Sequence, residues 1–226
     1  MPAKNPDLHG NAPDKAASVL VLIDVINDLE FEGGETLLSQ ALPMAERLAA
    51  LKRQARAAGI PAVYVNDNFG RWRSDLRALL AHCLTDGVRG QALVKQLVPE
   101  SDDYFVLKPK HSGFFSTTLD TLLAYLKART LILTGLTADN CVFFTASDAY
   151  LRDYHVIVPS DCVASIDPRH TRQALDHMHR VLKADVTAST GLSLSELAAG
   201  RASSDVVSAG QEQHEAGEKR GDDRRF

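Results

Sequence analysis

A cysteine stands where a buried strand is expected to give way to a helix. In "LILTGLTADNCVFFTASDAY", the pattern predicts a strand over Leu131 to Thr134 and a helix over Val142 to Tyr150, so Cys141 lies on the first helical turn. Backbone N–H groups are unpaired at a helix start and the helix dipole is positive there. A thiol at this point is expected to lose its proton more easily than a free cysteine. The alternative left open by this segment alone is a small, buried hydrophobic residue.

Six apolar runs of strand length recur along the chain, separated by segments of helical pattern. The runs are Ser18–Asp24, Pro61–Asp67, Asp103–Lys108, Thr130–Gly135, His155–Asp161 and Ala184–Ser189. Unbroken Val/Ile/Leu runs indicate burial on both faces, as in a parallel sheet covered by helices. The predicted fold is a three-layer α/β/α domain with a doubly wound, six-stranded parallel sheet in the order 3-2-1-4-5-6.

Helices are expected between these runs. The helical segments are Thr36–Gly59, a segment that starts near Ser116, Asn140–Asp153 and Pro168–Ala184. Glycine closes the first of them and proline stands in the first turn of the last, which are the usual positions of these residues at helix ends.

Three chemically capable residues stand at strand ends. Asp24 ends the first run, Lys108 ends the third, and Cys141 follows the fourth after a short turn. In doubly wound sheets, ligands bind beyond the carboxyl ends of the strands. An isolated strand-end aspartate is more often a helix cap, and an isolated lysine a solvated charge. The convergence of an acid, a cation and a thiol on one edge is therefore what indicates an active site.

Three longer motifs surround these residues: "VLIDVINDLEFEGG", "VLKPKHSGFFSTTLDTLL" and "LILTGLTADNCVFFTASDAYLRDYHVIVPSDCVAS". Together they resemble the isochorismatase-like cysteine hydrolase family, from about Val19 to Ala188. That family includes nicotinamidases, N-carbamoylsarcosine amidohydrolases, ureidoacrylate hydrolases and isochorismatases. The third motif is the most specific of the three, and the other two gain weight in combination with it.

The resemblance implies an Asp-Lys-Cys triad. Cys141 would be the nucleophile, Asp24 the base that takes the thiol proton, and Lys108 the cation that holds Asp24 and stabilises the thiolate. It also implies a cis peptide between Leu136 and Thr137, so that the amides of Thr137 and Cys141 form an oxyanion hole. A thiolate does need a base and a positive neighbour to form at neutral pH, which agrees with these roles.

These residues predict a hydrolase that cleaves a small amide-like or carbamoyl-like C–N bond through a covalent thioester. Two alternatives stay open: hydrolysis of a vinyl ether of the isochorismatase type with Asp24 and without Cys141, and a non-catalytic binding or scaffold protein. The resemblance further implies a small-molecule substrate and a homo-oligomer. We expect no cofactor.

The segment after the second run departs from the nicotinamidases, which carry an Asp-x-His pair that binds a metal. Here "YVNDNFGRWRSD" contains Asp67 but no histidine, and the next one is His82. Asp67 with Asn68 would be a poor ligand set, so we expect no metal. Many members also carry glutamine where this chain has Ile26, and the substrate contact of that glutamine is therefore absent.

Four further residues are candidates for substrate binding. Asn66, Phe69 and Trp72 follow the second run, and His111 follows Lys108 by three residues. Aromatic walls with a few polar groups are typical of small-molecule pockets. Trp72 is equally compatible with packing a loop or a subunit contact, and a solvated loop position is the alternative for His111.

Composition limits the class of protein. The chain has 226 residues, 45% of them hydrophobic, a net charge of -4 and a pI near 6.0, so no basic surface for nucleic acid is expected. Apolar runs are too short for a membrane span, and three scattered cysteines predict free thiols in the cytoplasm. We expect an N-terminal extension over residues 1–17, the hydrolase domain over residues 18–202 and a disordered polar tail over residues 203–226.

Overall fold

A parallel sheet forms the centre of the computed structural model, which describes residues 15–68 and 75–200. Its six strands are β1 (Ser18–Ile23), β2 (Ala62–Asp67), β3 (Tyr104–Lys108), β4 (Thr130–Leu136), β5 (His155–Ile157) and β6 (Val163–Ala164). The order is β3-β2-β1-β4-β5, and β6 pairs with β4 beyond the end of β5. Every pairing is parallel, which confirms the predicted fold class and the order of the first five strands.

The sixth strand is formed by Val163–Ala164 and not by the predicted run Ala184–Ser189. Of the run Ala184–Ser189, only Asp185 takes part in the sheet, through one parallel bridge to Ile157. The side chain of Asp185 accepts a hydrogen bond from the backbone N–H of Thr187 at 2.9 Å. Such a local bond turns the chain away from an extended path. The sixth strand is instead the short β6, which extends the β4 edge toward the carboxyl ends of the strands.

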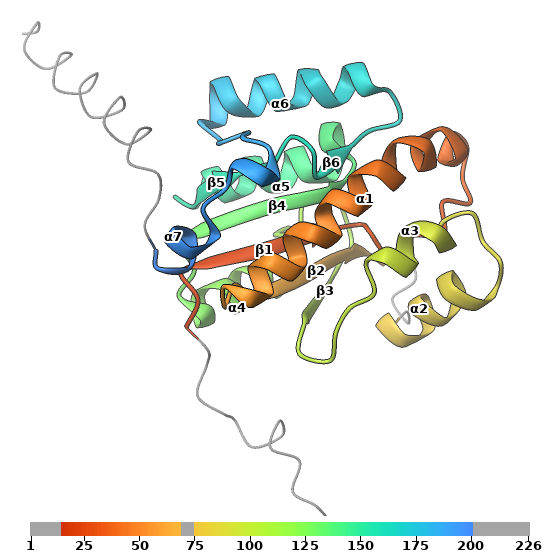
Figure 1. Cartoon of the computed structure of the whole chain (residues 1–226), viewed down its shortest axis with the longest axis horizontal. Coiled ribbons are helices and arrows are strands. Elements are labelled where there is room, and N and C mark those ends of the chain that lie inside the picture. The colour runs from red at the N-terminus through yellow and green to blue at the C-terminus, as the bar shows by residue number, and fades with distance from the viewer. Residues whose placement is uncertain (1–14, 69–74, 201–226) are drawn as a thin grey trace, which may run out of the picture.

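Seven α-helices of the described residues flank the sheet. They are α1 (Gly34–Ala57), α2 (Leu76–Thr85), α3 (Gln91–Gln96), α4 (Leu119–Leu126), α5 (Phe143–Tyr150), α6 (Pro168–Leu182) and α7 (Leu194–Ala198). Figure 1 shows α1 running across one face of the strands. The sequence pattern missed α2 and α3, which are short and follow a polar stretch.

Successive side chains of β1 pack against different helices, which shows which helices cover each face of the sheet. Leu20 and Leu22 are buried with residues of α1, α3 and α7, whereas Val19 and Val21 are buried with residues of α4, α5 and α6. Because successive side chains of a strand point to opposite faces, both faces of β1 are covered. The result is the predicted three-layer arrangement, with the carboxyl ends of the strands left as the edge where polar groups can gather.

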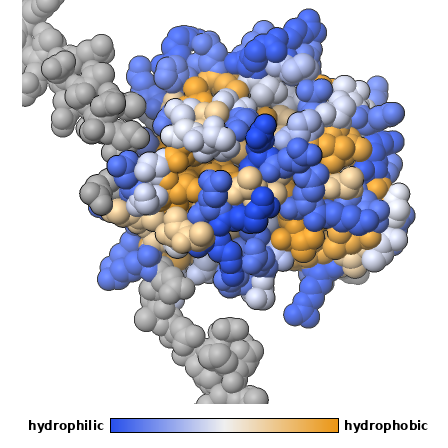
Figure 2. Space-filling model, in the orientation of Figure 1, coloured by the Kyte–Doolittle hydropathy of each residue, from blue (hydrophilic) through white to orange (hydrophobic). Residues whose placement is uncertain are grey.

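The surface around α1 is mixed in character. In Figure 2, hydrophilic residues cover most of this face and separate smaller hydrophobic patches. In the described part of the chain, no helix is both long and apolar enough to cross a membrane. Most of the predicted N-terminal extension and all of the predicted polar tail lie outside the described residues, and self-association stays a prediction.

Candidate active site

Three strand ends bring the predicted triad together. Asp24 directly follows β1 with a left-handed backbone angle φ of 52°, and Lys108 is the last residue of β3. Cys141 lies in a π-helical turn, Ala138–Val142, that connects β4 to α5. This turn occupies the place of the first helical turn predicted from the sequence. All three side chains therefore meet at the carboxyl edge of the sheet.

The amine of Lys108 lies between the carboxylate and the thiol. Its Nζ atom is 2.8 Å from Oδ2 of Asp24 and 3.4 Å from Sγ of Cys141. The Lys108 side chain is 0% exposed and that of Asp24 only 9% exposed. Lysine is almost never fully buried unless it is paired. Its complete burial beside an acid and a thiol distinguishes Lys108 from a solvated strand-end charge.

A second carboxylate, which the sequence analysis did not assign to the catalytic group, completes the cluster. The backbone N–H of Asp67 donates to Oδ1 of Asp24 at 2.7 Å, and Oδ2 of Asp67 is 3.5 Å from Nζ of Lys108. Asp67 is the last residue of β2, which lies between β1 and β3 in the sheet. The predicted strand order already placed this residue between Asp24 and Lys108. The sequence alone could therefore have predicted that Asp67 lies beside the triad.

Burial and charge set the protonation states in this cluster. Burial raises the pKa of Asp24 above its ordinary 3.8, against the opposing effect of Lys108. Burial acts to lower the pKa of Lys108, but its interactions with Asp24, Cys141 and Asp67 hold it above its ordinary 10.5. A carboxylate whose pKa lies closer to neutrality is a better match for accepting and returning a proton near neutral pH.

The expectation that Cys141 readily loses its proton in the resting protein is wrong. Burial, followed by the negative charge of Asp24, raises the pKa of this thiol to about 12, and Lys108 offsets only part of the rise. The resting cluster therefore holds a neutral thiol beside a base, and the thiolate must form during the attack.

The backbone before the cysteine also has special features. The peptide between Leu136 and Thr137 is cis, which confirms that expectation, while the role of the Thr137 and Cys141 amides as an oxyanion hole stays a prediction. Gly135 has φ of 104°, and a Cβ atom there would stand 2.1 Å from the carbonyl oxygen of Ile23. Only glycine lets β4 approach the end of β1 this closely, just before Asp24.

The predicted substrate-binding residues fall in different places. Asn66 is 0% exposed, and its side chain donates to the carbonyl oxygen of Ile26 at 2.6 Å and accepts from the N–H of the same residue at 3.4 Å. These bonds fasten the segment after β1 to β2. Phe69 and Trp72 lie outside the described residues. A substrate contact by any of the three stays a prediction.

His111 lies at the exposed side of the nucleophile. Its Nδ1 atom is 3.9 Å from Sγ of Cys141, and its ring stacks on that of Phe144 with 5.5 Å between centroids and 22° between planes. The residue itself is exposed. His111 therefore lies next to Cys141 at the surface, and its contact with a substrate stays a prediction.

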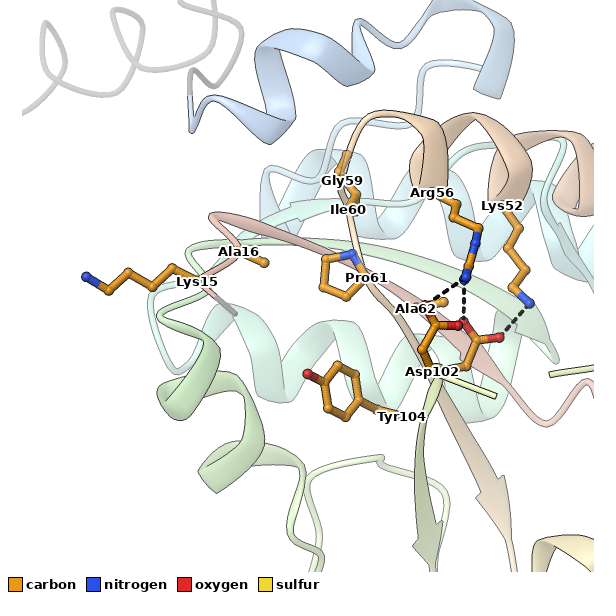
Figure 3. A pocket seen from close by; sticks show the side chains of 11 residues that line it. Lys15, Ala16, Lys52, Arg56, Gly59, Ile60, Pro61, Ala62, Asp102 and Tyr104 are labelled. Atoms are coloured by element: carbon orange, nitrogen blue, oxygen red, sulfur yellow. Dashed lines mark hydrogen bonds and ion pairs between the residues drawn. The ribbon is translucent and has the colours of Figure 1, made fainter. Parts of the chain in front are cut away.

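A cavity of about 440 Å³ lies at the opposite edge of the sheet, where β1, β2 and β3 begin. Figure 3 shows its charged wall, in which Lys52 pairs with Asp103 at 2.6 Å and Arg56 pairs with Asp102 at 2.7 Å. Its lining contains no cysteine, serine, threonine or histidine. With most of its charges already paired and no thiol or aliphatic hydroxyl, this cavity is a poorer candidate for catalysis than the cluster around Cys141.

Cys141 is expected to be the first of the three thiols to react with iodoacetamide. Cys83 and Cys162 are both 0% exposed, whereas Cys141 is partly exposed and touches Lys108. Burial raises the pKa of Cys83 to about 11 and that of Cys162 to about 12, so exposure rather than acidity separates the sites. Peptide mapping after brief labelling measures the order. Preferential labelling of Cys83 or Cys162 would contradict the assignment.

Chelation is expected to leave both activity and melting temperature unchanged. Among residues 15–68 and 75–200, no group of three or more His, Cys, Asp or Glu side chains is arranged to hold a metal ion. Metal removal would lower the stability of a protein that depended on a metal. The measurement is a melting curve and an assay after dialysis against EDTA. A loss that zinc or iron restores would show a metal site that we did not anticipate.

Comparisons with known proteins agree with this geometry. The family model described as the Isochorismatase domain matches residues 18–190. The chain is 39% identical over 173 residues to the isochorismatase family protein YaaI of Bacillus subtilis, covering 76% of this chain and 94% of that protein. It is 32% identical over 180 residues to the ureidoacrylate amidohydrolase RutB of Methylorubrum extorquens, covering 69% and 73% of the two chains.

A solved structure is similar as well. The N-carbamoylsarcosine amidase of Thermoplasma acidophilum superposes with a TM-score of 0.60 at 31% identity, covering 78% of this chain and 98% of that one. The superposition extends over almost the whole of the amidase. The architecture described above is therefore similar to that of a known hydrolase.

Proposed function

Because the chain belongs to the isochorismatase family of hydrolases, we propose that it is a cysteine-dependent hydrolase of a small amide-like or carbamoyl-like C–N bond. The observation that carries this proposal is the position of Lys108 Nζ, 2.8 Å from the Asp24 carboxylate and 3.4 Å from the Cys141 sulfur. An acid–cation pair that is buried without a use costs desolvation. The contact of this pair with a thiol is explained if the pair accepts the thiol proton and stabilises the thiolate.

The relatives support the choice of bond. One bears the name of an amidohydrolase and another that of an amidase. Both names denote hydrolysis of a C–N bond next to a carbonyl group. A thiolate is suited to that carbon, because it adds to a carbonyl and is a good leaving group in the second half of the reaction.

The proposed reaction gives each of Cys141, Asp24 and Lys108 a role in forming the covalent intermediate. The thiol proton of Cys141 passes to Asp24 as the sulfur forms a bond to the carbonyl carbon of the substrate. The tetrahedral intermediate then collapses, the C–N bond breaks, and the leaving nitrogen receives the proton from Asp24. Lys108 holds the carboxylate while it is charged and stabilises the sulfur as it becomes negative. The product of this half is a thioester on Cys141, which water hydrolyses.

Trapping the covalent intermediate tests the proposal. The protein is incubated with a panel of small primary amides, ureas and N-carbamoyl compounds, quenched in acid, digested, and searched for peptides of raised mass. We expect the acyl group of a turned-over substrate on the peptide that contains Cys141, and none in Cys141→Ser. Turnover that survives in Cys141→Ser would contradict the thioester route. Absence of turnover over the whole panel would favour a different bond or a non-catalytic role.

A further inference from the structure

The Cys141 sulfur has different neighbours on its buried and on its exposed side. On the buried side lie Asp24 and Lys108, which are 6% and 0% exposed when the whole residue is counted. On the exposed side lies His111, whose Nδ1 is 3.9 Å from the sulfur. An imidazole is a good proton acceptor at neutral pH and a common general base. The thiol therefore has a second potential base in addition to Asp24.

The oxygens of Asp24 are held by partners within the protein. Oδ1 accepts the N–H of Asp67 at 2.7 Å, and Oδ2 is paired with Lys108 at 2.8 Å. The water that cleaves a thioester has to arrive from solvent, once the amine product has left. Asp24 is buried, whereas His111 is exposed to solvent and lies 3.9 Å from the sulfur.

The ring of His111 has a defined orientation. It stacks on Phe144 of α5, with ring centroids 5.5 Å apart and planes 22° apart. Phe144 itself is 48% exposed, so the stacked pair forms part of the rim and is not buried in the core. Catalytic contacts in a protein without substrate are often longer than in the reacting complex, and 3.9 Å is compatible with a base that acts through one water.

We propose that His111 is the general base for hydrolysis of the thioester, so that acylation uses Asp24 and deacylation uses His111. The inference rests on the proposed function. Water loses a proton to Nδ1 of His111 as its oxygen bonds to the thioester carbon. The tetrahedral intermediate collapses, the C–S bond breaks, and the departing sulfur of Cys141 takes that proton back from Nδ1. The thiol and the neutral imidazole are regenerated, and the acid product carries the oxygen of the water.

The test separates the two halves of the reaction with p-nitrophenyl acetate, an activated acyl donor. Release of nitrophenolate in the initial burst reports acylation of Cys141, and the later linear phase reports deacylation. In His111→Gln we expect the burst to remain and the linear phase to fall about 10²-fold, the lower range for loss of a general base. Acetyl-enzyme should accumulate on the Cys141 peptide. Added imidazole should restore the linear phase in His111→Ala.

His177→Gln is the matched control, because His177 also contacts an aromatic ring, that of Phe143 at 5.4 Å, but lies on α6. It should leave both phases unchanged. An unchanged linear phase in His111→Gln, or an equal fall in both phases without imidazole rescue, would overturn the role of His111 alone. Absence of acetyl-enzyme on Cys141 in the wild type and in His111→Gln alike would overturn the proposed function, and the role of His111 with it.

Discussion

Asp24→Asn is expected to lower kcat about 10³-fold while it makes Cys141 easier to alkylate. The asparagine can still accept the N–H of Asp67, but it cannot take the thiol proton or return it to the leaving nitrogen. Loss of a general acid–base group typically costs 10²- to 10⁴-fold. The carboxylate charge also raises the pKa of Cys141, in addition to burial. Its removal lets the thiol ionise at lower pH.

Two pH profiles test this pair of effects. In the wild type, kcat/KM should fall toward acid pH as Asp24 becomes protonated, with a midpoint above 3.8 because burial raises its pKa. That acid limb should disappear in Asp24→Asn, and the profile of iodoacetamide labelling should move to lower pH. Asp176→Asn, an exposed change on α6, is the control and should alter neither profile. Retained turnover in Asp24→Asn would exclude Asp24 as the base.

Lys108→Met is expected to lower kcat by about 10²-fold or more and to slow alkylation of Cys141. Among residues 15–68 and 75–200, the Lys108 ammonium group is the positive neighbour that lies 3.4 Å from this sulfur, and it lowers the pKa of the thiol. Its loss leaves a buried carboxylate without its cation and a thiolate without stabilisation. Removing other groups that stabilise developing charge in an active site has a comparable effect on kcat. Stability can change in either direction, since removing a buried cation also removes a desolvation cost.

The measurement is the rate of Cys141 alkylation as a function of pH, and Lys110→Met is the matched control. Lys110 is exposed and two residues further along, so its loss should change stability by under about 0.5 kcal/mol and leave the thiol unaffected. For Lys108→Met the profile should move to higher pH, opposite to that of Asp24→Asn. Identical profiles in the wild type and Lys108→Met would show that this lysine does not tune the thiol.

Much of the site could be predicted because the geometry of parallel strands is regular. Unbroken apolar runs predicted β1, β3 and β4, and the carboxyl ends of such strands share one edge, so Asp24, Lys108 and Cys141 had to come near each other. The failed prediction is at Ala184–Ser189. That run has strand-like composition, but the side chain of Asp185 bonds to the following backbone and ends the pairing after one bridge.

Protonation could not be read from the sequence in the same way. The expected acidity of Cys141 came from its position near a helix start, which is a local feature. The actual balance depends on how deeply the thiol is buried and on the charge of Asp24, which is distant in sequence. Asn66 illustrates the same limit, because the hydrogen bonds of its amide to the backbone of Ile26 depend on packing and could not be predicted from its type and position.

The hydrogen bond from residue 67 to Asp24 is made by the main chain, and this affects which substitutions evolution can accept. Nineteen of the twenty amino acids carry that N–H, and proline alone lacks it. The support of Oδ1 at 2.7 Å is therefore largely independent of the side chain at this position. Residue 67 can therefore change while the base keeps its orientation, although loss of its charge also removes the ion pair between Asp67 and Lys108 at 3.5 Å. A descendant of this protein could thus alter this edge of the site without losing the support of its base.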